Sequence, residues 1–332
     1  MVLITGATGL VGSYLAIHLL ENNENVRAIY RTKSSINKTK NIFEINKKLD
    51  LFTKINWIRA DINDISELES AFQNIECVYH CAALISFDPR DEDQLRKVNI
   101  EGTANIVNFC LKYKVKKLCY VSSIAALGDL QEHQLIINEE TEWNPEKSHS
   151  DYAISKYGAE IETFRGQQEG LNVVIVNPGV ILGAGFLDSG SGEIFSKVKS
   201  GLNFYTNGTT AFVSVLDLVK IMYLLMKSNI SGEKFVIISE NWTYKKLLDT
   251  ISNTMNIKKP KHKVPEYVIE IMWRLDWILA NVFMQKRKLS KDLAQSLFAK
   301  DIYSSDKIKN TFNFEFEDLE FSIKNVVKTA AL

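Results

Sequence analysis

Short apolar runs alternate with amphipathic stretches along the first 180 residues of this 332-residue chain. Six runs predict strands, namely VLIT, NVRAIY, INWIRAD, ECVYHCAA, KKLCYVSS and NVVIVNPG. Stretches that carry apolar residues at spacings of three and four separate most of them, a pattern that indicates helices. This alternation predicts an α/β fold, with a doubly wound parallel sheet covered by helices on both faces.

The alternation weakens beyond Pro178. The segment GAGFLDSGSG is glycine-rich and predicts a loop. The stretches FVSVLDLVKIMYLLMKS and KFVIIS then predict a helix and a strand that return to the main sheet. We therefore expect a Rossmann domain built from residues 1–176 and about 212–240. A smaller, mostly helical substrate-binding lobe would contain residues of about 177–211 and 241–332.

Composition narrows the function classes. Forty basic residues balance forty acidic ones, whereas domains that bind nucleic acid usually carry a basic excess. The four cysteines form no CxxC pair and no cluster with histidines, so we expect reduced thiols and no metal site. No basic segment with a cleavage site precedes the first apolar run, which favours a cytoplasmic protein.

Residues 264–283, VPEYVIEIMWRLDWILANVF, are the most membrane-like stretch. Glu266, Glu270, Arg274 and Asp276 interrupt the stretch, and charges are costly at membrane depth. We expect an amphipathic helix of the C-terminal lobe and no transmembrane span. Basic flanks, KPKHK before and QKRK after, leave open whether this helix touches a membrane surface.

Three glycines, Gly6, Gly9 and Gly12, stand between the first predicted strand and the first predicted helix. In such a position one glycine permits a tight turn, one lets the backbone approach a pyrophosphate, and one lets the helix pack on the sheet. The phosphates would rest on unpaired N–H groups at the helix N-terminus. The candidate residues of this loop are Thr5, Gly6, Thr8, Gly9, Leu10, Val11 and Gly12.

The spacing in TGATGLVG is Gly-x-x-Gly-x-x-Gly, wider than the common Rossmann fingerprint. With this motif the chain resembles the extended short-chain dehydrogenase/reductase family, also called the NAD-dependent epimerase/dehydratase family. Further motifs follow in the order typical of that family: RADI, HCAA, VNIEGT, YVSSIAALG, YAISK and NPG. The resemblance covers roughly residues 2–240 and implies a nicotinamide cofactor.

The end of the second predicted strand indicates whether the cofactor is NAD(H) or NADP(H). No Asp or Glu lies between Glu24 and Glu44 to bind a ribose 2′-hydroxyl, and Arg31 and Lys33 stand there instead. A guanidinium suits a 2′-phosphate, so we expect NADP(H) to be preferred over NAD(H). The alternative is that Arg31 is a solvated loop charge.

The resemblance implies further cofactor contacts. An acidic residue after the third strand would bond the adenine amino group, small residues after the fourth would let the cofactor approach, and the end of the sixth would lie at the nicotinamide ring. In this chain these positions are Asp61 and Ile62, Ala82 and Ala83, and Pro178 and Gly179.

Tyr152 and Lys156 lie four residues apart in DYAISKYG and would project from one face of a helix. The family resemblance makes them the catalytic pair and selects Ser123, over Ser122, as the catalytic serine. Tyr152 and Lys156 are also cofactor-binding candidates, since Lys156 can bond the nicotinamide ribose. An ammonium about 4 Å from a phenol would favour the phenolate by roughly three pKa units. Tyr152 would then titrate near neutral pH as a general acid or base. The alternative is a surface pair on an amphipathic helix.

Several segments resemble the dihydroflavonol 4-reductase-like and 3β-hydroxysteroid dehydrogenase-like members, among them NVRAIYRTKSS and NPGVILGAG. This implies an oxidoreductase acting on a small carbonyl or alcohol substrate. Gly128 departs from the plant enzymes, which carry a polar substrate-reading residue there. An epimerase or dehydratase of nucleotide sugars is the alternative, although Thr210 and Ala211 replace the Arg-Asp pair of such enzymes. A second alternative is an NADP-sensing protein without catalysis.

Two further expectations come from the resemblance. Asn99, in VNIEGT, would support the segments of the catalytic serine and tyrosine. A homodimer through the predicted helices at residues 91–113 and 150–168 is also open.

Overall fold

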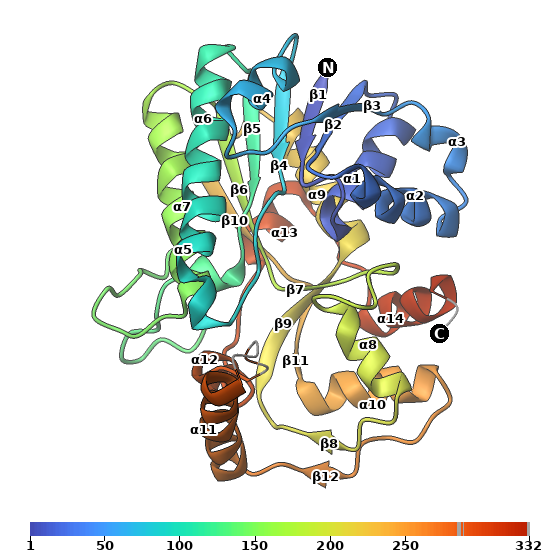
Figure 1. The fold of residues 1–332 in the computed structure, drawn as a ribbon, viewed down its shortest axis with the longest axis vertical. Coiled ribbons are helices and arrows are strands. Elements are labelled where there is room, and N and C mark those ends of the chain that lie inside the picture. The colour runs from blue at the N-terminus through green and yellow to red at the C-terminus, as the bar shows by residue number, and fades with distance from the viewer. Residues whose placement is uncertain (284–286, 288, 331–332) are drawn as a thin grey trace.

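The computed structural model describes residues 1–283, 287 and 289–330. Seven strands form the main sheet in the order β10-β6-β5-β4-β1-β2-β3, and every neighbouring pair is parallel (Figure 1). The strands are β1 (Val2–Thr5), β2 (Val26–Tyr30), β3 (Asn56–Arg59), β4 (Cys77–His80), β5 (Lys117–Val121), β6 (Val173–Pro178) and β10 (Glu233–Ile237). The predicted doubly wound sheet is therefore confirmed. The strand order reverses between β1 and β4, the point where such sheets bind ligands.

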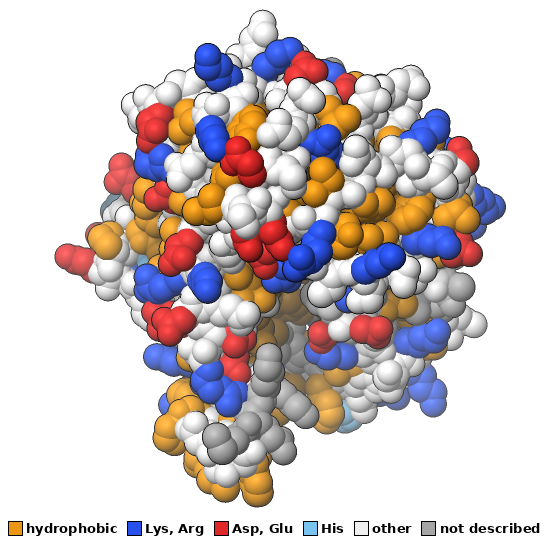
Figure 2. All heavy atoms as spheres, turned by 45° about the horizontal axis from the view of Figure 1, so that its top comes forward, with side chains coloured by type: hydrophobic (Ala, Val, Ile, Leu, Met, Phe, Trp, Pro, Cys, Tyr) orange, Lys and Arg blue, Asp and Glu red, His pale blue; other side chains and the backbone are white. Residues whose placement is uncertain are grey.

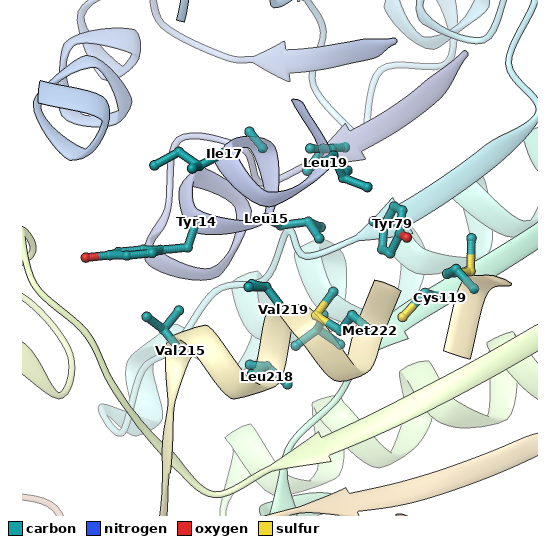
Figure 3. Close-up of a cluster of buried hydrophobic side chains, with 14 of the residues drawn as sticks. Tyr14, Leu15, Ile17, Leu19, Tyr79, Cys119, Val215, Leu218, Val219 and Met222 are labelled. Carbon is teal, nitrogen blue, oxygen red and sulfur yellow. The ribbon is translucent and has the colours of Figure 1, made fainter. Parts of the chain in front are cut away.

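Helices cover both faces of this sheet, because alternate strand residues face opposite sides. Val2 and Ile4 belong to a buried cluster with α1 and α9, whereas Leu3 belongs to a cluster with α4 and α6. Figure 3 shows the first cluster, to which Leu15 of α1, Val219 of α9 and Tyr79 of β4 all belong. The helices of the two faces are α1 (Leu10–Glu21), α2 (Ile36–Ile45), α3 (Leu49–Phe52) and α9 (Val215–Lys227), then α4 (Ile65–Ala71), α5 (Glu92–Leu95), α6 (Gly102–Lys112) and α7 (Asp151–Gln168).

A smaller lobe lies below the main sheet and carries two small sheets besides its helices (Figure 1). Its core packs Phe195, Trp242, Leu247 and Leu319. The strands are β7 (Val180–Leu182), β8 (Phe204–Tyr205), β9 (Thr209–Ser214), β11 (Glu240–Thr243) and β12 (His262–Lys263). The helices are α8 (Gly192–Lys199), α10 (Tyr244–Thr254), α11 (Glu266–Phe283), α12 (Lys291–Ser296) and α14 (Leu319–Thr329), while α13 (Asp306–Phe312) packs back on β10.

The segment after the glycine-rich loop divides between the two lobes. The first residues of the predicted returning helix, from Phe212 to Ser214, belong instead to β9, which pairs with β7 and β11. α9 and β10 then return to the main sheet as expected. Among the described residues, no helix is long and apolar enough to cross a membrane.

Candidate active site

The three glycines of the first loop meet different surroundings. Gly6 has φ +68°, and a Cβ there would lie 2.6 Å from the backbone of Ala82. A Cβ on Gly12 would lie 2.3 Å from the carbonyl oxygen of Gly6. A Cβ on Gly9 would meet only that same oxygen, at 3.4 Å. Packing therefore requires Gly6 and Gly12 to be glycine, whereas Gly9 leaves an open surface on the loop.

This open surface leads to the N-terminus of α1. Gly9 is the N-cap residue, no side chain caps the helix, and its first turn holds no acidic residue. The first N–H groups of a helix lack intrahelical partners and attract anions. Behind the loop, the Ser13 hydroxyl donates to the carbonyl oxygen of Ala7 at 3.0 Å. The loop thus offers a braced, uncapped helix end that fits a pyrophosphate.

An open cleft runs from this loop across the carboxyl ends of β1, β2, β3 and β4. It brings together eight of the predicted cofactor-binding residues, namely Gly6, Thr8, Gly9, Arg31, Asp61, Ile62, Ala82 and Ala83. Sequence reasoning missed seven further lining residues, namely Ile29, Tyr30, Thr32, Ser35, Ala60, Cys81 and Val98. Thr32 and Ser35 could have been inferred, because their hydroxyls follow Arg31 directly in YRTKSS.

The other predicted cofactor residues do not line this cleft. Thr5 and Gly12 are buried beneath the loop, Leu10 and Val11 lie in the first turn of α1, and Lys33 is exposed in the 3₁₀ turn η1 (Lys33–Ser35). Pro178 is buried at the end of β6. A Cβ on Gly179 would lie 2.5 Å from the carbonyl oxygen of Ala211. The close approach of β9 therefore explains this glycine without any ligand.

A buried chain of hydrogen bonds supports the loop from below. The Ala82 N–H donates to the Thr5 hydroxyl at 3.2 Å, and that hydroxyl lies 2.6 Å from Nδ1 of His80. Nε2 of His80 lies 3.0 Å from the Thr103 hydroxyl, which donates to the Asn99 carbonyl oxygen. Burial lowers the pKa of His80 to about 3, so its ring is neutral at physiological pH. Sequence reasoning had assigned no role to this histidine.

Asn99 links the same region to α7. Its side chain exchanges two hydrogen bonds with the backbone of Leu84, at 2.7 and 2.9 Å. Its Nδ2 also donates to the Ser155 hydroxyl at 2.8 Å. Asn99 lies in a π-helical stretch, η3 (Arg96–Glu101), that turns its side chain inward. These contacts join Asn99 to the helix of Tyr152, and its support of the serine segment stays a prediction.

The three predicted catalytic residues lie at the carboxyl end of β5 and on α7. Ser123 follows β5 at the start of a 3₁₀ turn, η4 (Ile124–Ala126), and Tyr152 and Lys156 come from the first two turns of α7. Ser150 caps that helix by accepting from the Ala153 N–H at 3.2 Å. Ser123 lies close enough to Tyr152 for hydrogen bonding between their side chains to lower the pKa of the tyrosine. The geometry therefore places the serine beside the tyrosine.

The ammonium group of Lys156 contacts the backbone and a ring of β5. Its Nζ donates to the Val121 carbonyl oxygen at 2.7 Å and lies 4.4 Å from the centre of the Tyr120 ring. Burial raises the pKa of Tyr152, and the bond to Ser123 lowers it only in part. That the Lys156 ammonium lowers the pKa of this tyrosine therefore stays a prediction, and burial acts in the opposite direction. Burial also lowers the pKa of Lys156 itself to about 7.

A buried carboxylate lies one turn beyond Lys156. Oε1 of Glu160 accepts from the Ser122 hydroxyl and from Nδ2 of Asn177, both at 2.5 Å. Nδ2 of Asn177 also donates to the Ser123 carbonyl oxygen at 2.9 Å. Burial raises the pKa of Glu160, and its negative charge in turn raises that of Lys156. Glu160 is a site residue that sequence reasoning missed, although it continues the Tyr152 and Lys156 spacing by four.

The loops next to Tyr152 bring one aromatic ring to it and leave Phe87 and Ile85 partly exposed. The Phe87 ring lies 5.7 Å from the Tyr152 ring. A Cβ on Gly128 would lie 2.1 Å from the Glu142 carbonyl, so the packing leaves no room for a side chain at this position. Within the described ranges, no group of histidine, cysteine or acidic side chains is arranged to hold a metal ion.

The uncapped glycine loop, the cleft beyond it and the serine–tyrosine pair define a nicotinamide-cofactor-binding α/β protein. The model of the NAD dependent epimerase/dehydratase family matches residues 2–237, and the chain belongs to that family. This family includes both epimerases and reductases.

Relatives of known name and structure agree with this assignment. The chain is 27% identical to sterol demethylase protein B of Methylococcus capsulatus, over 81% of this chain and 78% of that one. It is 26% identical to anthocyanidin reductase of Arabidopsis thaliana, over 79% and 81% of the two chains. The crystal structure of gox2253 shares the fold, with a TM-score of 0.81 and 24% identity over 99% and 97%.

Proposed function

We propose that the protein is an NADP(H)-dependent oxidoreductase that interconverts a carbonyl and a secondary alcohol in a small organic substrate. When bound, the nicotinamide would supply a hydride to the carbonyl carbon or take one from the alcohol carbon. The observation that carries the proposal is the placement of Ser123 beside Tyr152 at the carboxyl end of the sheet, with Lys156 one turn further along α7.

The proton comes from Tyr152 in this proposal. In the direction of reduction, the carbonyl oxygen becomes an alkoxide and must gain one proton. Tyr152 is a neutral phenol at physiological pH because burial raises its pKa, so it holds a proton to donate. Ser123 would hold the substrate oxygen by donating a hydrogen bond. The Lys156 ammonium would attract the resulting phenolate, which must regain a proton before the next turnover.

The preference for NADP(H) rests on the cleft lining at the end of β2. Arg31, Thr32 and Ser35 line the cleft there, and together they offer a guanidinium and two hydroxyls. The acidic residue in this lining is Asp61, at the end of β3. The Asn63 N–H donates to Oδ1 of Asp61 at 3.0 Å and orients that carboxylate. A ribose 2′-phosphate matches the donors at the end of β2 better than a 2′-hydroxyl does.

One experiment tests the reaction class. A panel of carbonyl compounds, with sugar nucleotides alongside, is incubated with NADPH, and cofactor absorbance and products are followed. We expect one NADPH to be consumed for each carbonyl reduced. Conversion of a sugar nucleotide without net cofactor change would instead identify an epimerase. Tight NADPH binding without turnover of any compound would support the non-catalytic alternative.

A further inference from the structure

Helix α11 exposes a continuous apolar face. Nine of its large apolar side chains are between 48% and 67% exposed, and Trp277 lies outside the face that the other eight share. Those eight are Tyr267, Ile271, Met272, Leu275, Ile278, Leu279, Val282 and Phe283. At 100° per residue they span about 160° of the helix circumference. Ile269 and Ala280, the buried residues of the helix, lie on the opposite side. The helix is 18 residues long, so this face extends for about 27 Å.

The helix projects from the lower end of the molecule, and apolar side chains gather on that projection (Figures 1 and 2). Phe204 adds to the apolar surface of this lobe, since it is 57% exposed and its ring lies 5.8 Å from His262. Singly exposed apolar residues are normal on soluble proteins, but a contiguous face of this size marks an interaction surface. We call the eight residues of α11 the apolar face.

Basic residues lie at both sequence flanks of the helix. Lys258, Lys259, Lys261 and Lys263 precede it, all exposed, and no acidic residue lies among them. Arg287 follows the helix and is described, whereas Gln285, Lys286 and Lys288 lie outside the described residues. Charges within the helix are mostly compensated, because Glu270 pairs with Arg274 at 2.5 Å and Asp276 lies 3.6 Å from Arg287.

We propose that the apolar face docks on an anionic membrane surface, with α11 lying in the plane of the headgroups and the flanking lysines on the phosphates. Amphipathic helices with basic flanks bind bilayers in this way, without crossing them. A second copy of the chain fits less well. Parallel pairing of two α11 helices would bring Lys258, Lys259, Lys261 and Lys263 of both copies together, cations against cations.

The docked surface would lie close to the catalytic side of the site. The Arg287 N–H donates to Oδ2 of Asp88 at 3.1 Å, and Asp88 follows Phe87, whose ring contacts that of Tyr152. Ile85, on the same loop, is also exposed. The proposal for the apolar face does not depend on the reaction, and its test uses binding alone.

Vesicle flotation tests the proposal. The full chain is mixed with vesicles of phosphatidylcholine alone, or of phosphatidylcholine and phosphatidylserine, and the floated fraction is measured. We expect flotation with the anionic vesicles. The double variant Ile271→Ser, Leu275→Ser should partition at least about tenfold less. The control double variant Ile65→Ser, Leu135→Ser also replaces exposed apolar residues and should float like the wild type.

Charge and oligomeric state complete the test. Replacing Lys258, Lys259, Lys261 and Lys263 by Gln should lower binding to anionic vesicles about fivefold for each lysine that reaches the headgroups. Flotation that fails with both vesicle types overturns the proposal. A second result also overturns it: the wild type does not float and is a dimer in light scattering, whereas the Ile271→Ser, Leu275→Ser variant is a monomer. The apolar face would then join two copies of the chain.

Discussion

The cofactor-binding half and the catalytic half of the site are held in place by different interactions. In the cofactor half, backbone packs on backbone: Gly12 in the first turn of α1 packs on Gly6 of the preceding loop, and Gly6 packs on Ala82. In the catalytic half, buried side chains meet: Glu160 holds Ser122, which follows β5, and Asn177, which lies in β6. The first half depends on the absence of side chains, and the second depends on their polar groups.

This difference determines how each half responds to pH. Contacts between glycines and backbone carry no titratable group, and burial lowers the pKa of His80 beneath the loop to about 3, far below neutrality. The catalytic half holds two buried groups with shifted pKa values, since burial lowers that of Lys156 to about 7 and raises that of Glu160. We therefore expect the pH dependence of activity near neutrality to come from the catalytic half. Replacement of a small residue by a larger one should be least tolerated in the cofactor half.

Replacing Tyr152 by Phe should have the largest effect, and it should affect the function of the catalytic half alone. The variant removes one hydroxyl, so turnover should fall by roughly a hundredfold or more, the usual effect of losing a general acid. The affinity for NADPH should stay nearly unchanged, because the cleft is intact. Steady-state kinetics and cofactor titration measure the two quantities. Tyr157→Phe, on the same helix, is the control, and near-normal turnover of Tyr152→Phe would refute the assignment.

The next effect concerns cofactor choice within the cofactor half. Arg31→Ala should weaken NADPH binding roughly tenfold to a hundredfold, because a charge-assisted contact to the 2′-phosphate is lost. The affinity for NADH should not change. Fluorescence titration of both cofactors with both proteins measures this. Equal affinity of the wild type for NADH and NADPH would contradict the prediction.

Alanine substitutions at Gly12 and Gly9 should differ in what they change, stability in the first case and NADPH affinity in the second. Gly12→Ala places a Cβ 2.3 Å from the Gly6 carbonyl oxygen and should lower the free energy of unfolding by about 1–3 kcal/mol. Gly9→Ala meets protein only at 3.4 Å and has φ −101°, so its stability should stay near the wild-type value. It should nevertheless bind NADPH more weakly, because the methyl group stands where the pyrophosphate would approach. Thermal unfolding and titration distinguish the two, and equal stability losses would contradict this account.

The sequence was most informative where function follows from neighbouring residues. The strand–loop–helix pattern around Gly6, Gly9 and Gly12 predicted the loop, and the alternation of apolar runs predicted the parallel sheet, which the structure confirms. The spacing of Tyr152 and Lys156 placed both on α7. Each of these signals lies within a few residues along the chain.

The sequence was least informative where distant segments meet. Gly179 is explained by the carbonyl of Ala211, and the hydrogen bonds of Glu160 reach back 38 residues to Ser122. The direction of the Lys156 ammonium depends on the Val121 carbonyl, so helical spacing alone could not give the pKa of Tyr152. The amphipathic character of α11 was predictable, but which side packs on the lobe was not.

The smallest predicted effect is a change in pH dependence caused by Glu160→Gln. The Lys156 ammonium is present below its pKa of about 7 and lost as the pH rises through it. The negative charge of Glu160 opposes the effect of burial and raises that pKa. Without this charge the pKa of Lys156 should fall further. Because the ammonium is expected to bond the nicotinamide ribose, the loss of NADPH affinity with rising pH should begin at lower pH. The amide oxygen of glutamine can still accept from Ser122 and Asn177, which preserves the packing.

Cofactor titrations across the neutral pH range would measure this shift, with Glu162→Gln as the matched control. Glu162 lies on the same helix but pairs with Arg165 near the surface, so its replacement should leave the midpoint unchanged. A shift in Glu160→Gln alone would place the pH response in the catalytic half, because the glycine loop is the same in all three proteins. An unshifted midpoint in Glu160→Gln would show that its carboxylate only holds Ser122 and Asn177, and that Lys156 titrates independently of it.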